Sequence, residues 1–495
     1  MAVYDNGYYG SFSIPTPKGV YQAAGDTNIN ADYAYRAENM RTERGLLATA
    51  HGTGRAFPAL GYPIETFTRF YRRNRPEDPE VYVAAANGTI YTYTTGEAGW
   101  VERKGGFYSN AWSYVTYETV KDGKTIDLLL MTNSEDGMIA VYGSDLRVEA
   151  KALTIGDDYK EVKFSVLGRH AERIWGTGDP EYPDNIFYSR PYDPFDWTDV
   201  PETPELGGGM IQQPTWDGDA FIALEPFGGY LLAIKPHTIF EIRGTDPSSF
   251  TITEAYGTDG PMQARTIVTD RLRMLFLARS GLGMYDGSTL SLLSRDALYE
   301  TMRMRMPGMD EKATACVCDH VYYLALCVRE SESDVLTENN TVVEFDTERG
   351  TFMIRKGIRV KDFYSIAGKV YFTQADSPFE VLRYNDPNAT GYLGAPMDSL
   401  WETGWFDLDK RNVKSEFTLR FTAETDASDV PVEITIVTDR RERRKVVMLQ
   451  KGRKDYKVSI HTRGVRMKLR MHSWKKAASW RIHGGVLVEF STEEE

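Results

Sequence analysis

Cysteine is scarce in this chain, which has three, Cys316, Cys318 and Cys327, among 495 residues. An odd and sparse set excludes the disulfide framework of small secreted domains and predicts folding in a reducing compartment. Cys316 and Cys318 stand two apart in an extended run, but together with Cys327 and His320 they match no standard zinc spacing. We therefore expect the three thiols to be packed in a core, and we predict no metal site.

Long apolar runs are also missing. No run approaches the roughly 18 residues that a membrane-spanning helix requires, so no membrane anchor is expected. The first residues, MAVYDNGYYGSFSIPTP, lack a basic start followed by an apolar core, and no signal peptide is expected. A protein of this kind that ends outside a cell requires another exit route, such as lysis.

Catalytic signatures are absent as well. The sequence contains no HExxH, no GxSxG and no GxxxxGK[ST] motif. Its seven His are scattered, and His170 is expected to make structural hydrogen bonds rather than to act as a base. The acidic stretches at 179–185 and 216–219 lack calcium-loop spacing and are expected to be turns. A propeller glycosidase needs paired carboxylates, but 71 acidic residues offer no basis for choosing a pair. We therefore predict no catalytic residue, no cofactor and no enzyme activity.

Charge is unevenly distributed. The net charge of −13 argues against a protein that binds nucleic acid over its whole surface. From Trp401 onward, however, 20 basic residues face 15 acidic ones, whereas the preceding part holds 38 basic and 56 acidic residues. The strongest basic run is DRRERRK at 439–445, which is predicted to form a hairpin tip between two alternating strands. This tip could contact phosphates; the alternatives are a solvated loop or a contact with an acidic partner subunit. Its basic residues are Arg440, Arg441, Arg443, Arg444 and Lys445.

Short apolar runs separated by turn residues dominate the middle of the chain. They begin near positions 81, 126, 230, 274, 321 and 363, most of them about 45 residues apart, and the larger gap leaves room for one more unit. A period of 40–50 residues with several strands in each unit is typical of a β-propeller. We predict an all-β fold with a propeller of about seven blades over 63–396. A pair of β-sandwiches with coincidental spacing is the alternative.

The flanking segments differ from this pattern. Residues 1–62 are predicted to form an irregular N-terminal arm, with one short helix from Asp32 to Arg44 that Asp32 caps. A second helix, capped by Asp296 and ending near Pro307, is predicted to interrupt the propeller. From Trp401 the clean alternation of apolar and charged residues predicts a β-sandwich, assigned to 397–490. Residues 491–495 are predicted to be a disordered tail.

Several stretches resemble one protein family. The segments RIWGTG at 173–178 and NIFYSRPYDPFDW at 185–197 resemble consecutive strands of tailed-bacteriophage tail and neck proteins. The following stretches at 238–268 and 273–287, the segment AENMRTERGLLATAHG at 37–52, and the C-terminal stretches at 405–421 and 480–490 are similar to further parts of the same proteins. The family is the tail nozzle, or packaged-DNA stabilisation, protein of short-tailed phages, and the resemblance extends over nearly the whole chain.

The resemblance implies a structural virion protein made in the bacterial cytoplasm. Members form an oligomeric ring, typically a hexamer, that continues the DNA channel below the portal and adaptor, contacts further tail proteins, and retains the genome until ejection. No catalytic residues accompany the resemblance. Two other functions remain open: a glycan-binding or glycan-cleaving tail propeller, and a cellular propeller that binds other proteins.

Overall fold

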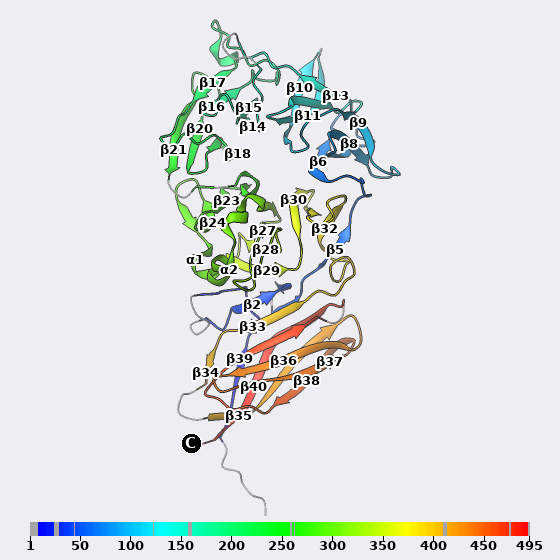
Figure 1. Ribbon diagram of the computed structural model, residues 1–495, viewed down its shortest axis with the longest axis vertical. Coiled ribbons are helices and arrows are strands. Elements are labelled where there is room, and N and C mark those ends of the chain that lie inside the picture. The colour runs from blue at the N-terminus through cyan, green and yellow to red at the C-terminus, as the bar shows by residue number, and fades with distance from the viewer. Residues whose placement is uncertain are drawn as a thin grey trace, which may run out of the picture.

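The molecule is elongated and almost entirely β, with a propeller at one end and a sandwich at the other (Figure 1). The predicted fold class is confirmed. No helix in the described part of the chain combines the length and hydropathy that crossing a membrane requires. The computed structural model describes residues 8–23, 29–43, 45–121, 123–156, 161–257, 260–261, 263–408, 413–474 and 477–493.

In the described part of the chain, seven antiparallel blades of four strands form the propeller, which agrees with the predicted count of about seven; six blades are separate sheets, and blade six is one end of a ten-stranded sheet. Blades one to three contain β6 (Ile64–Tyr71), β7 (Glu80–Ala86), β8 (Thr89–Thr94) and β9 (Val101–Gly105); β10 (Ser113–Lys121), β11 (Lys124–Asn133), β12 (Gly137–Tyr142) and β13 (Val148–Lys151); and β14 (Val166–His170), β15 (Arg173–Thr177), β16 (Asn185–Tyr188) and β17 (Gly209–Gln212).

Blades four to seven complete the ring. They contain β18 (Ala223–Phe227), β19 (Tyr230–Ile234), β20 (Thr238–Arg243) and β21 (Thr251–Gly257); β22 (Val268–Asp270), β23 (Arg273–Ala278), β24 (Gly281–Tyr285) and β25 (Leu290–Leu292); β26 (Thr314–Cys318), β27 (Val321–Leu326), β28 (Thr341–Asp346) and β29 (Thr351–Lys356); and β30 (Val360–Ile366), β31 (Lys369–Gln374), β32 (Val381–Asp386) and β5 (Gly52–Arg55).

Each pair of neighbouring blades buries its own apolar cluster. Leu129 and Ile139 of blade two, for example, pack against Val83 and Ile90 of blade one. The second strand of each blade is apolar on both faces, because blades cover it on both sides; all five residues of β15 are buried. Blades five and six share a cluster that continues without a break into the sandwich core. Stacking therefore buries apolar side chains on both faces of each blade, which a single blade could not do alone.

An N-terminal strand closes the propeller ring. β5 pairs antiparallel with β32 as the outermost strand of blade seven, with Gly54 opposite Arg383. Gly52 fits there because it has no side chain: a Cβ at that position would lie 2.2 Å from the carbonyl oxygen of Gly391. Because β5 lies more than 300 residues before β32 in sequence, closure joins the two ends of the propeller segment.

The sandwich consists of two sheets, and the N-terminal segment supplies strands to both. One sheet contains β1 (Tyr8–Ile14), β3 (Met40–Glu43), β4 (Leu46–Thr49), β40 (Trp480–Glu493), β35 (Val413–Thr425) and β38 (Gly452–Ile460). The other contains β2 (Ala34–Glu38), β33 (Ser399–Thr403), β34 (Phe406–Asp407), β39 (Arg466–Ser473), β36 (Val430–Thr438) and β37 (Glu442–Leu449).

The propeller and the sandwich share one continuous sheet. β2 pairs with β29 of blade six on one side and with β33 of the sandwich on the other. Blade six therefore extends through β2 into the second sandwich sheet, and the two strands lie at the joint in Figure 1. A shared sheet resists bending in a way that a single-chain linker does not.

Asn39 holds this joint together. It is 1% exposed, has a φ of 56°, and marks the point where the chain passes from β2 in one sheet to β3 in the other. Its side-chain Nδ2 donates to the carbonyl oxygen of Asp398 at 2.5 Å, and its Oδ1 accepts from the backbone N–H of Lys356 at 2.9 Å and from the Tyr392 hydroxyl at 2.6 Å. One side chain thus binds blade six, the connecting segment and the sandwich.

The predicted N-terminal arm and its helix were wrong. Within the helix predicted from Asp32 to Arg44, residues 34–38 form β2 and residues 40–43 form β3, whereas Arg44 lies outside the described residues; the rest of the segment contributes β1, β4 and β5. The run contains good helix formers, but Ala34 and Ala37 are fully buried in the joint, and backbone pairing with β29 and β33 overrides local propensity. The predicted tail was also misplaced at its start, because β40 continues to Glu493; residues 494–495 lie outside the described residues.

The second predicted helix exists but is broken. It forms α1 (Ser294–Ala297) and α2 (Tyr299–Met304), so Asp296 lies inside the first turn and does not cap it. The 3₁₀ turns are η1 (Pro204–Leu206), η2 (Ala264–Thr266) and η3 (Pro307–Lys312). Leu298, which is fully buried, separates the two short helices because its side chain is drawn into the core shared by blades five and six.

Candidate functional site

The basic run lies on the sandwich but is not simply a hairpin tip. Only Arg440 and Arg441 belong to the turn between β36 and β37, whereas Arg443, Arg444 and Lys445 lie within β37. The prediction of a tip was therefore wrong for the last three residues, because the strand begins earlier than the charge pattern indicates. All five side chains are exposed, and five successive residues of β37, Glu442 to Val446, have no buried face.

Hydrogen bonds fix the turn rigidly. The Thr438 backbone N–H donates to the carbonyl oxygen of Arg441 at 2.9 Å. Asp439 accepts from the backbone N–H groups of Val465 and Arg466 at 2.9 and 3.1 Å. The arginines are thus presented from a fixed backbone.

Few side chains of the basic run form ion pairs within the described residues. The Arg444 guanidinium lies 3.6 Å from Glu433, and its side chain is 71% exposed, so this pair contributes less than about 1 kcal/mol. Within the described residues, Arg443 and Lys445 have no ion-pair partner. Their charge is therefore available to a binding partner.

Two sheet edges lie next to this charge. β37 is the last strand of one sandwich sheet and β38 is the last strand of the other, and they follow one another on the same side of the sandwich (Figure 1). Val446 and Met448 of β37 are 51% and 46% exposed. Such an edge strand offers unpaired backbone N–H and C=O groups to another chain. Because like charges repel, the positive charge of β37 opposes pairing with β37 of a second copy. An acidic or strand-forming partner fits it better than a second copy of the same strand.

The innermost strands of the propeller hold a carboxyl group whose pKa is strongly raised. The first strands of successive blades contact one another, as β14 contacts β18 and β26 contacts β30, so they surround the propeller axis. On β18, burial raises the pKa of Glu225 to about 7, although Thr269 donates a hydrogen bond to it at 3.3 Å. No motif in the sequence distinguishes Glu225.

Another acidic group on an innermost strand is neutralised differently. Asp362 of β30 forms a short ion pair with Arg265, and burial nevertheless raises its pKa. In the described part of the chain, neither Glu225 nor Asp362 hydrogen-bonds to another carboxyl group.

The sequence candidates for metal binding are placed apart. Cys316 and Cys318 pack in the core between blades six and seven, where burial raises the pKa of both thiols. Cys327 is also buried, and its Sγ lies 2.8 Å from the Glu338 carbonyl oxygen. His320 instead contacts Asp270, with its Nδ1 at 3.0 Å from the carboxylate. Among the described residues, no three His, Cys, Asp or Glu side chains gather closely enough to hold a metal ion.

His170 and the acidic loops have structural surroundings. His170 lies 2.9 Å from the Gly244 carbonyl oxygen and against Trp175, and burial lowers its pKa, as expected for a structural histidine. Asp179 accepts from the backbone N–H of Glu181 in its own turn and from the backbone N–H of Lys163, which precedes β14. The loop at 216–219 is a turn as predicted, but Trp216 in it is 94% exposed, which the sequence did not indicate.

Comparisons with known proteins find only distant structural similarities. No family model matches the chain, and no curated protein matches it. Among solved structures, a chain of a mitotic checkpoint complex is 9% identical with a TM-score of 0.36, covering 70% of this chain and 95% of that one. The dihydro-heme d1 dehydrogenase NirN is 11% identical with a TM-score of 0.37, covering 83% and 79%. A structure titled as that of a CBM4 module is 15% identical over 28% of this chain, with a TM-score of 0.16.

Proposed function

We propose that the protein is a structural component of a bacteriophage tail or neck. In this proposal, copies assemble into a ring, hexameric by resemblance to nozzle proteins, below the portal and adaptor. The ring continues the DNA channel and retains the genome until ejection, and it contacts other tail proteins. The protein is made in the bacterial cytoplasm and is not an enzyme.

The observation that carries this proposal is the open, basic side of the sandwich. β37 and β38 end both sheets on one side, and β37 presents exposed Arg443, Arg444 and Val446. The part of the chain before Trp401 has a formal charge of −18, from 38 basic and 56 acidic residues. A basic edge on one copy and an acidic surface on the next give a head-to-tail contact, which closes into a ring when the rotation permits.

The joint between the domains supports a mechanical role. The sheet that runs from blade six through β2 into the sandwich, the shared core and the Asn39 hydrogen bonds join the two domains without a flexible linker. A ring that retains packaged DNA must resist force, and rigid subunits do so better than hinged ones.

Electrostatics fit a channel through which DNA slides. Each phosphate that a protein neutralises adds affinity, so a bore lined with basic residues would hold DNA during ejection. An acidic ring repels DNA and lets it pass, and one level of basic residues is enough to hold its end.

The test is a phage whose copy of this gene carries R440S, R441S, R443S and R444S together. We expect ring assembly to fail or virions to lose packaged DNA, measured as the ratio of protected genomes to particles. The matched control removes four propeller arginines of similar exposure, R73S, R271S, R349S and R359S, whose side chains are at least 61% exposed. Intact assembly and genome retention in the first variant would refute the role of the basic edge.

A glycan-binding propeller is the second candidate, and Trp216 favours it. Its indole is 94% exposed beside a hollow of about 460 Å³ that Gln213, His237 and Glu254 also line. An apolar platform with a few polar groups around it is the usual form of a sugar site. A glycan array with the wild-type chain and W216A tests this: selective binding lost in W216A supports it, and no selective binding by the wild type removes it.

A further inference from the structure

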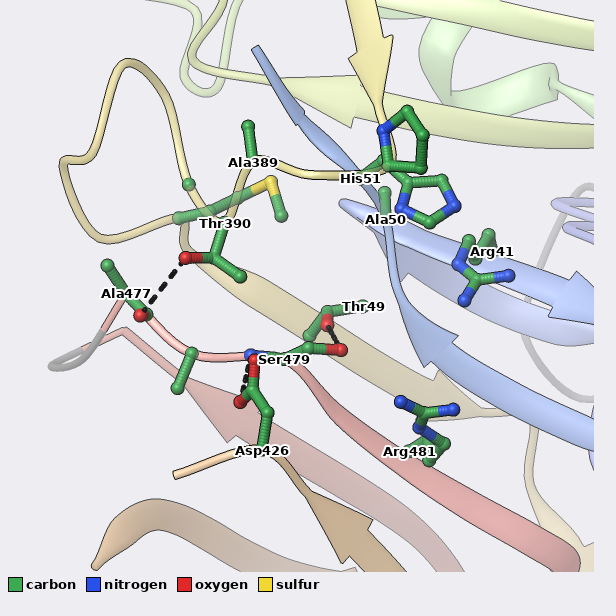
Figure 2. Close-up of a pocket in the computed structure, with 14 residues that line it drawn as sticks. Arg41, Thr49, Ala50, His51, Ala389, Thr390, Asp426, Ala477, Ser479 and Arg481 are labelled. Carbon is green, nitrogen blue, oxygen red and sulfur yellow. Dashed lines mark hydrogen bonds between the residues drawn. The ribbon is translucent and has the colours of Figure 1, made fainter. Parts of the chain in front are cut away.

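A cavity lies where the sandwich meets the end of the propeller segment (Figure 2). It has a volume of about 150 Å³ and is lined by residues from β3, from the end of β4, from the loop after β32 and from the start of β40. These segments are far apart in sequence. The cavity has room for a small oxyanion but not for the backbone of a nucleic-acid duplex.

Two guanidinium groups share one side of the cavity. In Figure 2, Arg41 and Arg481 point toward one another, with the His51 imidazole beside Arg41. Arg41 forms a short ion pair with Glu43, whereas Arg481 has no ion-pair partner within the described residues. The Nε atoms of both arginines are buried and lack a hydrogen-bond partner there.

A third guanidinium group lies behind this pair. Arg355 on β29 is 1% exposed, and it donates to the His51 carbonyl oxygen at 2.6 Å. Its Nε is also buried without a partner in the described part of the chain. The acidic side chain on the cavity wall, Asp426, accepts a hydrogen bond from the Ser479 backbone N–H at 3.1 Å and so faces another part of the wall (Figure 2).

Burial and the neighbouring guanidinium groups both act on the titratable side chains of this cluster. Burial, Arg481 and Arg355 lower the pKa of Arg41. Burial, followed by Arg41 and Arg355, lowers the pKa of His51 to about 4, so the imidazole is neutral at pH 7. Arg41 is paired with Glu43, but Arg481 has no ion-pair partner within the described residues, and a bound anion would supply the counter-charge that Arg481 lacks.

We propose that this junction cavity binds a small phosphate-type oxyanion between Arg41 and Arg481. Guanidinium groups bind phosphate oxygens through paired hydrogen bonds, and the side chains of Arg41 and Arg481 both line the cavity. The bound anion would connect β3 to β40 and so stabilise the joint between the propeller and the sandwich. This site does not depend on ring formation and can be tested on the isolated chain.

The experiment measures binding of inorganic phosphate to the full chain by calorimetry and by thermal unfolding, with chloride at equal ionic strength as reference. We expect phosphate, but not chloride, to raise the melting temperature of the wild type. R481Q should bind phosphate at least tenfold more weakly. R420Q is the control, because Arg420 lies on the neighbouring strand and pairs with Glu489 outside the cavity.

The stability of R481Q without phosphate distinguishes loss of the anion site from simple loss of structure. In phosphate-free buffer, R481Q should be as stable as the wild type or more stable, because it removes a charge that repels Arg41. In the wild type, phosphate should also raise the pKa of His51 from its low value, followed by NMR of labelled histidines and assigned with H51Q. Equal responses of wild type and R481Q to phosphate, or equal effects of phosphate and chloride, would overturn the proposal.

Competition identifies the source of the anion. A nucleoside monophosphate that displaces inorganic phosphate would assign the site to a terminal phosphate group, and failure to displace it would assign the site to the free ion. Both results keep the proposal. Displacement by a blunt, unphosphorylated DNA duplex at equal phosphate concentration would contradict a closed site for a small anion.

Discussion

Replacing Asn39 with alanine should weaken the connection between the propeller and the sandwich. The change removes the hydrogen bond to the Asp398 carbonyl oxygen and leaves the partly buried backbone N–H of Lys356 without its acceptor. Each loss costs about 1–2 kcal/mol. Alanine at a φ of 56° adds about 1 kcal/mol, because L-residues disfavour this region. The expected loss of unfolding free energy is therefore about 3–5 kcal/mol.

Differential scanning calorimetry of the full chain is the suitable assay. We expect the wild type to unfold with coupled domains and N39A to show an earlier transition for the less stable domain. N39G is the matched control for backbone strain, since glycine accepts a positive φ, and it should recover about 1 kcal/mol relative to N39A. If N39A unfolds within 1 kcal/mol of the wild type, the joint does not depend on Asn39 as described.

Three further predictions follow from the fold and the site. G52A should lower the free energy of unfolding in urea by roughly 1–3 kcal/mol, because the added Cβ would overlap the backbone that closes the propeller. The control G229A has open space around the added Cβ and should leave the free energy of unfolding unchanged. Equal effects of the two substitutions would contradict the role of closure. Because folding raises the pKa of Glu225 to about 7, the unfolding free energy of the wild type should fall by about 1–3 kcal/mol as pH rises from about 4.3 to 7 and then stay constant. The unfolding free energy of E225Q should not show this fall. Parallel pH profiles of the two proteins would refute the prediction. R443E with R444E should abolish assembly in native mass measurements and increased salt should weaken wild-type assembly; salt-independent assembly would argue against an electrostatic contact.

The sequence indicated the propeller because its signal is local. The predicted starts near 81, 126, 230, 274 and 321 fall on the second strands β7, β11, β19, β23 and β27, which are apolar enough to stand out. The missing unit around RIWGTG is β15 of blade three. Hairpin turns such as Asn87 and Gly88, with φ of 49° and 66°, also carry their own local signature.

The arrangement of the N-terminal segment could not be read in the same way. β5 closes the propeller and β2 joins it to the sandwich through partners more than 300 residues away. Local composition favoured a helix there, since Ala, Glu and Arg are good helix formers. Only the partners in three dimensions decide that these residues form strands.

The candidate sites also combine features that are visible in the sequence with features that only the fold creates. The basic run was visible as a charge pattern, although the structure moved three of its residues from a tip into β37. The raised pKa of Glu225 and the convergence of Arg41 with Arg481 depend on burial and on long-range contacts, for which one sequence carries no signal. Conversely, Cys316 and His320 are close in sequence, but they contact different parts of the fold.

The native mass of the purified chain, with negative-stain imaging of the same sample, tests the proposed function most directly. The account predicts closed rings with a central bore, either alone or after addition of portal–adaptor complex, with the sandwich edge β37 at the contact between subunits. A strictly monomeric particle of 56.1 kDa that does not bind the portal–adaptor complex would contradict the proposed function. Such a result would favour a propeller that binds glycans or cellular proteins.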